Sequence, residues 1–459
     1  MLRALLFVTL THSFVLLSNN ARAQPYQQPL GAAEYTAPFI AAGFRALFTC
    51  SAHFVAGRPL DDIEKIELLD THAADLPRPV IDSKHFLVRA SDGNGHTRIA
   101  AFRPHMGCTL LPPQYTEADI AKLAGIAAPS KANISNTPFP MGEQVNITVN
   151  AKLEDLLDNA FDGKTFGDGN IATGIVILRG QQLLAERYRP GFGVHQGYRT
   201  WSTAKSISAS LLGIAVGDGL IDLDQPVPIA AWQYPDDPRA AITWNHLLWM
   251  SSGLDSRGAD TNAVYFGGQD AESGATQSIL LEKPGSHWKY ANNDTLLYLI
   301  GLRTLLNNDR QYWQFPYKRL LHKIGMYHTF MEMDHLGNFI GSSQVYSTTR
   351  DLARFGLLYL QDGVWEGEQI LPQGWRNFVS TAAPSRPEQE GKQGYGAQFW
   401  LLGTLPGIPD DAFTSAGNKG QLATVIPSEN LVIVRTGVDP AGKRWQQDKF
   451  VVEVLKALR

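Results

Sequence analysis

The sequence predicts a mixed α/β (α+β) protein whose antiparallel sheet is completed by two distant parts of the chain. Strand-like runs around a tight turn cover residues 173–179 and 181–188. Similar runs return near the carboxyl end, over 423–426 and 431–435. Between them the apolar residues recur mainly at helical spacing. This order favours one sheet flanked by helices, with a helical region inserted between its two halves.

Length and composition indicate how many domains the chain contains. The 459 residues, 44% hydrophobic and 18% charged, are typical of a globular protein with two or three domains. We expect a signal peptide over residues 1–23, an N-terminal module and linker over 24–145, and a larger domain over 146–459 with its helical region at about 200–345. A formal net charge of −4 without a basic run argues against a nucleic-acid-binding function.

The first residues have the pattern of a secretory signal. Arg3 precedes a mostly apolar stretch, and Ala21-Arg22-Ala23 forms a cleavage site, so the mature chain would begin at Gln24. The alternative, a membrane anchor, is disfavoured because polar residues interrupt a stretch that is already too short to span a bilayer. We therefore expect a periplasmic or secreted protein with no stable membrane span after cleavage.

The N-terminal module contains both cysteines. Residues 24 to about 40 are predicted to be a leader, and 46–112 to contain strand-like pieces, including a hairpin of 85–89 with 97–102. In an oxidising compartment Cys50 and Cys108 are expected to form a disulfide. Two free thiols, or a zinc site with His53 and His105, are the alternatives. The module has no catalytic constellation and is interpreted as structural or substrate-shaping.

Capping residues predict several helices in the larger domain. Residues 151–161 form one, Thr243 begins another that runs to Gly253, and Thr348 with Asp351 begins one over 352–360. A helix over 445–458 closes the chain.

The strongest candidate for chemistry is Ser202-Thr203-Ala204-Lys205. Apolar residues at helical spacing follow it until Gly217, so the serine lies at the mouth of a buried helix. At i and i+3 the lysine amine can reach the serine hydroxyl. The same pattern occurs at Ser286 and Lys289, but without an apolar helix behind it. We interpret this second copy as a coincidence of composition.

Two further segments could complete a site around Ser202. Tyr290-Ala291-Asn292 offers a phenol that can relay a proton and an amide that can hold the lysine. Ser415-Ala416-Gly417-Asn418 precedes a strand, where small residues allow close approach of a ligand. The N–H groups of Ser202 and Asn418 could then form an oxyanion hole.

Together these segments resemble the serine β-lactamase and penicillin-binding-protein superfamily, in the class C and D-alanyl-D-alanine-carboxypeptidase-like branch. The resemblance covers about residues 146–459 and implies the β-lactamase/transpeptidase-like fold. Besides the segments above it includes Lys205-Ser206-Ile207, Leu211-Leu212-Gly213, Leu223-Asp224-Gln225-Pro226-Val227, Ile242-Thr243, His246-Leu247-Leu248, Met250-Ser251-Ser252-Gly253-Leu254, Asp351-Leu352-Ala353-Arg354-Phe355-Gly356, Gly363-Val364-Trp365-Glu366-Gly367 and Ile370-Leu371-Pro372.

The resemblance implies a role for each site residue. Ser202 would be the acylated nucleophile, and Lys205 its base or the group that lowers the pKa of Tyr290. Tyr290 would protonate the leaving nitrogen, and Asn292 would orient Lys205 and the substrate. Ser415, Gly417 and Asn418 would contribute to substrate and oxyanion binding. No metal or organic cofactor is implied.

One departure from the family pattern bears on the substrate. Much of the family begins the third motif with Lys or His, whereas this chain has Ser415, with Lys419 a few positions later. The Ser-Ala-Gly form is similar to 6-aminohexanoate-dimer-hydrolase-like members and favours a linear amide or ester as substrate. A β-lactamase or D-Ala-D-Ala carboxypeptidase is the alternative activity, and a non-turnover ligand-binding or sensor protein of the same fold is the alternative class.

Other enzyme classes lack their main motif. The sequence contains no Gly-x-Ser-x-Gly, no His-Glu-x-x-His and no phosphate-binding loop. The identity of the substrate is expected to depend on loops such as residues 260–282. The sequence predicts no oligomeric state.

Overall fold

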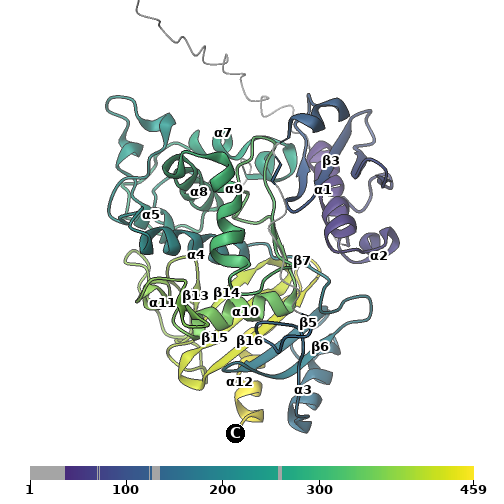
Figure 1. Cartoon of the computed structure of the whole chain (residues 1–459), viewed down its shortest axis with the longest axis vertical. Coiled ribbons are helices and arrows are strands. Elements are labelled where there is room, and N and C mark those ends of the chain that lie inside the picture. Colours follow the sequence, from purple (N-terminus) through teal and green to yellow (C-terminus); the bar gives the residue numbers. More distant parts are fainter. Residues whose placement is uncertain (1–36, 70, 72, 124, 127–134, 257–260) are drawn as a thin grey trace, which may run out of the picture.

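The computed structural model of the chain describes residues 37–69, 71, 73–123, 125–126, 135–256 and 261–459 (Figure 1). The signal peptide predicted at 1–23, and the leader as far as residue 36, lie outside these residues. The described chain forms a central sheet, a helical region beside it and a separate small sheet near the amino end.

The central sheet has seven strands in which every neighbouring pair is antiparallel. Their order is β12 (Gly394–Tyr395), β13 (Trp400–Leu401), β14 (Phe413–Gly417), β15 (Gln421–Ile426), β16 (Leu431–Gly437), β5 (Ala172–Arg179) and β6 (Gln182–Tyr188). The pairing of β16 with β5 joins the two ends of the larger domain. The prediction of a sheet completed by two distant parts of the chain is therefore confirmed.

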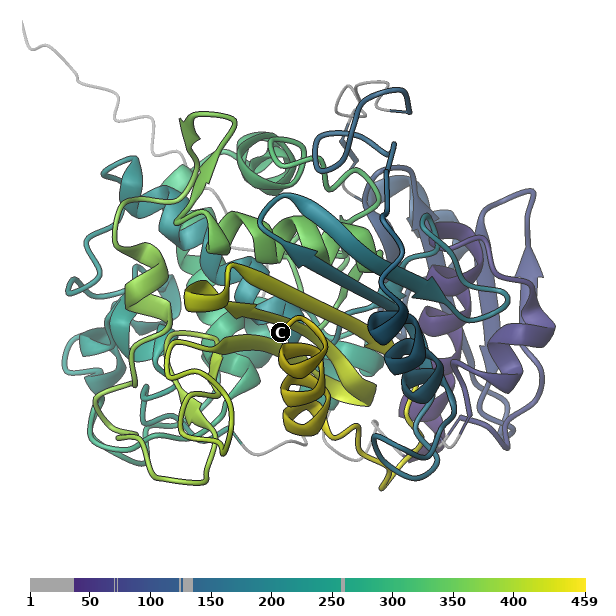
Figure 2. The same ribbon diagram turned by 90° about the horizontal axis from the view of Figure 1, so that it is seen from below.

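Helices cover both faces of this sheet. Helix α10 (Thr349–Leu360) packs on one face, and α3 (Ala151–Phe161) and α12 (Gln447–Ala457) lie on the other (Figure 2). Successive side chains of β16 alternate accordingly, with Val432 and Val434 in the core below α10 and Leu431 and Ile433 in the core below α3 and α12. Covering both faces explains why β5 and β16 are buried along almost their whole length and consist mainly of apolar residues.

The inserted helical region connects β6 to the carboxyl-terminal strands. Its helices are α4 (Thr203–Gly217), α5 (Trp244–Leu248), α7 (Ala271–Thr276), α8 (Asn292–Leu306) and α9 (Asp309–Pro316), with a π-helix η5 (Ala263–Gly267) before α7. A three-stranded sheet of β7 (Tyr198–Arg199), β9 (Val345–Ser347) and β8 (Phe330–Met331) lies beside it. The hairpin β10 (Val364–Trp365) and β11 (Glu368–Gln369) and helix α11 (Trp375–Val379) follow α10.

The amino-terminal part differs from its prediction at the start. Helix α1 (Ala37–Cys50) begins where a leader and strand-like pieces were expected, so that expectation is wrong for residues 37–50. Helix α1 is apolar on nearly every side, so its sequence does not show the amphipathic period of a surface helix. It also has no acidic residue in its first turn, so a usual signal for the start of a helix is absent. It packs on a sheet of β1 (Val80–Asp82), β2 (Leu87–Ser91), β3 (Thr97–Arg103) and β4 (Gly107–Leu110), which contains the expected hairpin.

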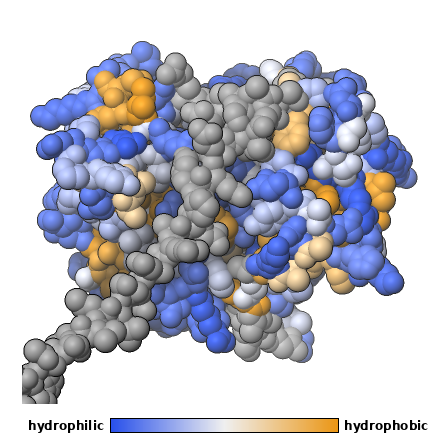
Figure 3. Space-filling model, turned by 90° about the horizontal axis from the view of Figure 1, so that it is seen from above, coloured by the Kyte–Doolittle hydropathy of each residue, from blue (hydrophilic) through white to orange (hydrophobic). Residues whose placement is uncertain are grey.

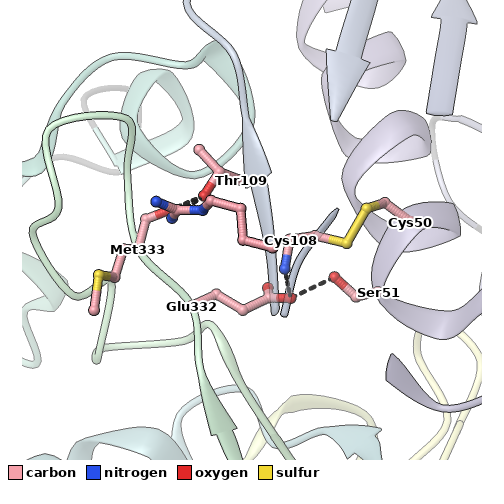
Figure 4. Close-up of a disulfide and its surroundings, with 7 residues drawn as sticks. Cys50, Ser51, Cys108, Thr109, Glu332 and Met333 are labelled. Atoms are coloured by element: carbon pink, nitrogen blue, oxygen red, sulfur yellow. Dashed lines mark hydrogen bonds between the residues drawn. A yellow bond between two sulfur atoms is a disulfide. The ribbon is translucent and has the colours of Figure 1, made fainter. Parts of the chain in front are cut away.

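The two cysteines fasten α1 to this sheet. Cys50 at the end of α1 and Cys108 in β4 form a disulfide, with their Cα atoms 6.1 Å apart (Figure 4). Both sulfurs are thereby used, so the alternative of a zinc site with His53 and His105 is wrong. Next to the disulfide, the buried carboxylate of Glu332 accepts hydrogen bonds from Ser51 Oγ at 2.6 Å and from the Cys108 N–H at 2.9 Å. These contacts hold the small sheet against the strand region that follows β8.

The surface of the molecule is mixed in polarity. On the face seen from above, hydrophobic areas are small and separated by hydrophilic ones (Figure 3). One described helical stretch, Ala37–Val55, is long and apolar enough to cross a membrane by length and hydropathy alone. Because 67% of its apolar window is buried inside the protein, it has the features of a core helix.

Candidate active site

Ser202 lies at the junction between β7 and helix α4. Trp201, directly before it, has a left-handed backbone with φ of +49°, and Lys205 N–H donates to the Ser202 carbonyl at 3.0 Å to start the helix. A non-glycine residue in this conformation is uncommon outside sites where the backbone is constrained for function. The turn places the Ser202 side chain at the wall of a cavity of about 1700 Å³.

Lys205 lies one helical turn further on and is almost fully buried. Its Nζ is 3.2 Å from Ser202 Oγ, 2.7 Å from Asn292 Oδ1 and 2.7 Å from the carbonyl oxygen of Ser342. Burial lowers the pKa of the amine from its usual 10.5 to about 7. A neutral amine has two N–H groups, which fit the two carbonyl acceptors, and one lone pair, which remains for the Ser202 hydroxyl.

Tyr290, from the predicted segment Tyr290-Ala291-Asn292, lines the same cavity. Its ring stacks on Trp400 with the centroids 5.7 Å apart and meets Tyr395 edge-on at 6.0 Å. Lys205 Nζ lies 5.1 Å from the centre of the Tyr290 ring. Burial raises the pKa of Tyr290 to about 12, and a hydrogen bond with Ser202 opposes this rise. The phenol is therefore protonated at neutral pH.

Asn292 connects these groups as the first residue of α8. The helix is buried along most of its length, and Tyr298 from it donates to the Lys205 carbonyl at 3.1 Å. Rigid packing of α8 against α4 thus positions Asn292 relative to the Lys205 amine.

Strand β14 approaches the nucleophile very closely at Gly417. A Cβ at this position would lie 2.0 Å from the Thr200 carbonyl and 3.1 Å from the Ser202 nitrogen. Only glycine permits this approach. Asn418, the next residue, lines the same cavity as Ser202, and an oxyanion hole formed by their two N–H groups stays a prediction.

The structure separates the remaining predicted residues into two groups. Gly417, Asn418 and Lys419 line the cavity together with Ser202 and Tyr290. Ser415 is fully buried in β14, and its hydroxyl has no hydrogen-bond partner among the described residues. Ser415 is not part of the cavity lining, so a direct contact with substrate remains a prediction.

The second Ser-x-x-Lys sequence lies elsewhere. Ser286 is exposed in the loop before α8, and its hydroxyl donates to the Lys283 carbonyl at 2.6 Å. Lys289 is exposed as well. This pair has neither the burial nor the acceptors that surround Lys205.

Sequence reasoning missed several groups of the site. The Ser342 carbonyl is one of the two acceptors on Lys205, but a backbone atom leaves no mark in the sequence. Trp400 and Tyr395 enclose Tyr290, although nothing in their own strands indicates a site. Ile40 and Phe44 of α1 line the cavity, which the prediction of a leader and strands at 24–112 could not anticipate.

Comparison with known proteins agrees with this architecture. A protein-family model described as Beta-lactamase matches residues 172–444, which is more than half of the chain. The chain belongs to the beta-lactamase family. The predicted resemblance and the β-lactamase/transpeptidase-like fold are therefore confirmed, and the chain falls among the hydrolases of the β-lactamase and penicillin-binding-protein superfamily.

Individual members of this superfamily are distant relatives. The 6-aminohexanoate-dimer hydrolase of Paenarthrobacter ureafaciens is 25% identical over 312 residues, which cover 62% of this chain and 78% of that protein. A penicillin-binding protein homologue from Pyrococcus abyssi has a TM-score of 0.51 at 17% identity, over 67% of this chain and 77% of the other. A D-stereospecific amidohydrolase from Streptomyces has a TM-score of 0.50 at 17% identity, over 67% and 98%. The two structures share the fold with this beta-lactamase-family chain.

Proposed function

We propose that the protein is a serine hydrolase that cleaves a linear amide or ester through an acyl-enzyme on Ser202. The observation that carries this proposal is the environment of Lys205. A buried amine with a pKa of about 7 lies 3.2 Å from the Ser202 hydroxyl, while two carbonyl oxygens occupy its N–H groups. This is the arrangement required to activate a serine at neutral pH.

Acylation would begin when neutral Lys205 takes the proton of Ser202 Oγ and the oxygen attacks the substrate carbonyl. The N–H groups of Ser202 and Asn418 would stabilise the negative charge that develops on the carbonyl oxygen. As the tetrahedral intermediate collapses, Tyr290 would donate its proton to the leaving nitrogen or oxygen and take one from the Lys205 ammonium. The bond to the leaving group breaks, and Lys205 returns to its neutral form.

Deacylation would repeat the sequence with water in place of the leaving group. Neutral Lys205 would accept one proton of the attacking water as the hydroxide adds to the ester carbonyl. That proton would return to Ser202 Oγ as the ester bond breaks, which restores the serine hydroxyl and neutral Lys205 and releases the free acid. In this scheme Asn292 is a positioning residue, since its amide oxygen holds Lys205 at 2.7 Å. The scheme uses side chains and backbone alone, without a metal or organic cofactor.

A linear amide or ester is the preferred substrate class for two reasons. The relative that is named a 6-aminohexanoate-dimer hydrolase matches this chain over 312 residues. The position where much of the family has Lys or His is occupied by a buried serine, which supplies no positive charge for a β-lactam carboxylate. A periplasmic or secreted location is part of the same proposal, and the Cys50–Cys108 disulfide supports it, because such bonds persist in oxidising compartments.

A pre-steady-state assay with a chromogenic ester tests the proposal. We expect a burst of about one equivalent of product followed by continued release, because acylation and deacylation are separate steps. A burst that then stops would favour a non-turnover sensor. Turnover of a chromogenic cephalosporin at a rate equal to that of the ester would favour a β-lactamase. Absence of product with every ester and amide would contradict a hydrolase.

A further inference from the structure

One wall of the active-site cavity comes from outside the part of the chain that matches the family. Besides Pro38 in its first turn, four residues of α1 line the cavity: Ala37, Ile40, Ala41 and Phe44. They follow the spacing i, i+3, i+4 and i+7, which places them on one helical face. Ile40 and Phe44 are only half-buried on a helix whose other apolar residues are almost all buried. The helix therefore presents an apolar stripe, here called the α1 stripe, to the cavity.

The α1 stripe leads towards the nucleophile. Phe44 stacks on Phe48 with the ring centroids 4.0 Å apart, and Phe48 in turn lies 5.4 Å from the ring of Trp201. Phe266 packs against Phe44 at 4.9 Å, and both Trp201 and Phe266 also line the cavity. An apolar surface thus continues from α1 to the residue that precedes Ser202.

This wall is held rigidly. A Cβ at Gly43 of α1 would lie 1.8 Å from the carbonyl oxygen of Phe266, so the two backbones are in direct contact. The Cys50–Cys108 disulfide fixes the far end of the helix. A wall that is fixed in this way can select a substrate by shape without first being ordered.

The rest of the cavity rim has a different character. Arg386, Lys392, Lys419, Lys443 and Arg444 line it, against two acidic residues, Asp439 and Asp448. Asp439 is paired with the buried Arg435, and Lys443 is paired with Asp168 at 3.1 Å. Besides these two, the lining holds Arg386, Lys392, Lys419 and Arg444 against Asp448. Because like charges repel, this positive rim disfavours a substrate whose chain ends in a protonated amine. The name of the relative from Paenarthrobacter, 6-aminohexanoate-dimer hydrolase, contains such an amine.

From the proposed hydrolase function and these contacts, we infer that the α1 stripe binds an uncharged apolar chain of the substrate. The substrate class is thus an amide or ester with a medium-length alkyl or aryl chain. The stripe from Ala37 to Phe44 is about 10 Å long, at about 1.5 Å per residue. Each methylene buried on it should raise kcat/KM about fourfold until the stripe is covered.

Two series of substrates test this inference, one followed by the release of p-nitrophenolate and the other by pH-stat titration of the acetic acid released. The first varies the acyl chain of p-nitrophenyl esters from two to twelve carbons, and the second varies the alcohol of alkyl acetates. We expect kcat/KM of the wild-type protein to rise with chain length in one series, which then identifies the chain that the stripe binds. An ω-amino acyl ester should be a poorer substrate than the alkyl ester of equal length.

Variants of the stripe make the test specific. We expect Ile40→Ala and Phe44→Ala to lower kcat/KM for the best long-chain substrate at least tenfold and to leave that for the acetyl ester within twofold. Leu336→Ala is the matched control, because Leu336 is an exposed leucine outside the cavity. If Phe44→Ala also lowers kcat/KM for the acetyl ester, the chain-length dependence of Ile40→Ala and Ile40→Asn decides whether the stripe binds the substrate chain. An unchanged chain-length dependence in the Ile40 variants would overturn the inference, whereas inactivity of the wild type would instead contradict the proposed function.

A second inference concerns three side chains outside the proposed active site. Glu143, His195 and His328 each offer one ligand atom, and these atoms all lie within 4.8 Å of one another. His195 lies between the other two residues, with Nδ1 3.1 Å from His328 Nε2 and the opposite ring nitrogen, Nε2, 3.5 Å from Glu143 Oε2, and only one of these two nitrogens can bind an ion. Ligands of a tetrahedral zinc ion lie roughly 3.3 Å apart, because each is about 2.0 Å from the metal, so the three ligand atoms would draw together on binding.

Two of these residues are held in place through their backbones by the start of α10. Arg350 Nη1 donates to the Glu143 carbonyl at 3.0 Å, and the His328 N–H donates to Asp351 Oδ2 at 2.9 Å. His195 comes from the connection between β6 and β7 and is about half exposed, so water can complete the coordination. We propose that these three side chains bind one Zn²⁺, which would clip the segment before α3 to the β7 and β8 sheet.

Calorimetric titration of the metal-free protein with ZnCl₂ tests this second proposal. We expect one ion per chain with micromolar or tighter affinity and a rise in the melting temperature. His195→Ala and His328→Ala should each weaken binding at least tenfold. His85→Ala is the control, because His85 forms a surface pair with Asp82 at 2.9 Å outside the proposed zinc site. It should leave the zinc affinity unchanged. No uptake, or uptake that both site variants retain, would mean an adventitious ion only and would overturn the proposal.

Discussion

Lys205 carries the chemistry of the site through its surroundings. The carbonyl oxygens on its amine favour the charged form, whereas complete burial disfavours it, and burial has the larger effect. The result is an amine that loses its proton near neutral pH. Tyr290 changes in the opposite direction, since burial raises its pKa to about 12. In the proposed mechanism these two shifts separate the roles, with Lys205 as the base and Tyr290 as the acid.

The pH dependence of hydrolysis tests this assignment. The pKa of Lys205 is lowered to about 7, so the amine is charged and inactive below that pH and neutral above it. We expect kcat/KM to rise about tenfold per pH unit up to about pH 7 and then to level off, because this profile reports groups of the free enzyme. Steady-state kinetics from pH 5 to 9 measures it.

Two lysine variants accompany that profile. Lys205→Ala should lower kcat/KM about 1000-fold, as loss of a general base does. Lys289→Ala, in the exposed second copy of the motif, should leave both the rate and the profile unchanged. A flat profile in the wild type, or an effect of Lys289→Ala, would contradict the role given to Lys205.

At the scale of elements, the site depends on the contact between β14 and the turn before α4. Gly417→Ala places a Cβ 2.0 Å from the Thr200 carbonyl, so the strand or the turn must move by more than 1 Å. We expect kcat/KM to fall about 100-fold or more. Gly217→Ala at the end of α4 is the control, because its Cβ would make only ordinary contacts with Pro372 at 3.5 Å or more. Equal activity of the two variants would show that the close approach is not needed.

Helix α1 depends on the disulfide at its end. Cys50 and Cys108 are 58 residues apart, and a cross-link of this span restricts the unfolded chain by about 4 kcal/mol. We expect the double variant Cys50→Ala, Cys108→Ala to lose about that much unfolding free energy in urea titrations. A loss below about 1 kcal/mol would indicate that the contacts of Glu332, rather than the covalent bond, hold the module.

Glu332 makes the attachment of the small sheet sensitive to pH. Burial raises the pKa of its carboxyl from 4.5 to about 7. Between pH 4.5 and pH 7 the carboxyl is therefore protonated in the folded protein and ionised in the unfolded chain. Its contribution to stability is therefore complete below pH 4.5 and is lost as the pH rises to 7. We expect Glu332→Gln, which stays neutral, to gain unfolding free energy relative to the wild type over this range. A difference that does not change with pH would contradict the shift.

For the whole molecule, the sequence was informative where a local rule decides the structure. Helix α3 covers the predicted residues, and it begins where predicted because Asn150 caps its amino end. The expectation that no apolar helix follows Ser286 is wrong, because the buried helix α8 begins at Asn292. The two Ser-x-x-Lys copies differ instead in their distance from the helix: Lys205 lies inside α4 and Ser202 lines the cavity, whereas Ser286 and Lys289 lie in the exposed loop before α8.

The remaining features depend on packing between distant segments. Helix α1 lacks a polar face, so its sequence has no helical period to detect. The Ser342 carbonyl, the ring of Trp400 and the α1 stripe reach the cavity only through the tertiary arrangement. None of these contacts is encoded within a single stretch of chain. The position of the candidate nucleophile could therefore be predicted from a local motif, whereas the walls of its cavity could not.

Covalent labelling tests the central claim, that Ser202 is the nucleophile, most directly. After brief incubation with a fluorophosphonate, intact-mass and peptide measurements should show one adduct per chain on the peptide that contains Ser202. Ser202→Ala should show no adduct and lose ester hydrolysis, while Ser286→Ala should match the wild type in both. An adduct on Ser286, or undiminished labelling and turnover in Ser202→Ala, would contradict the account.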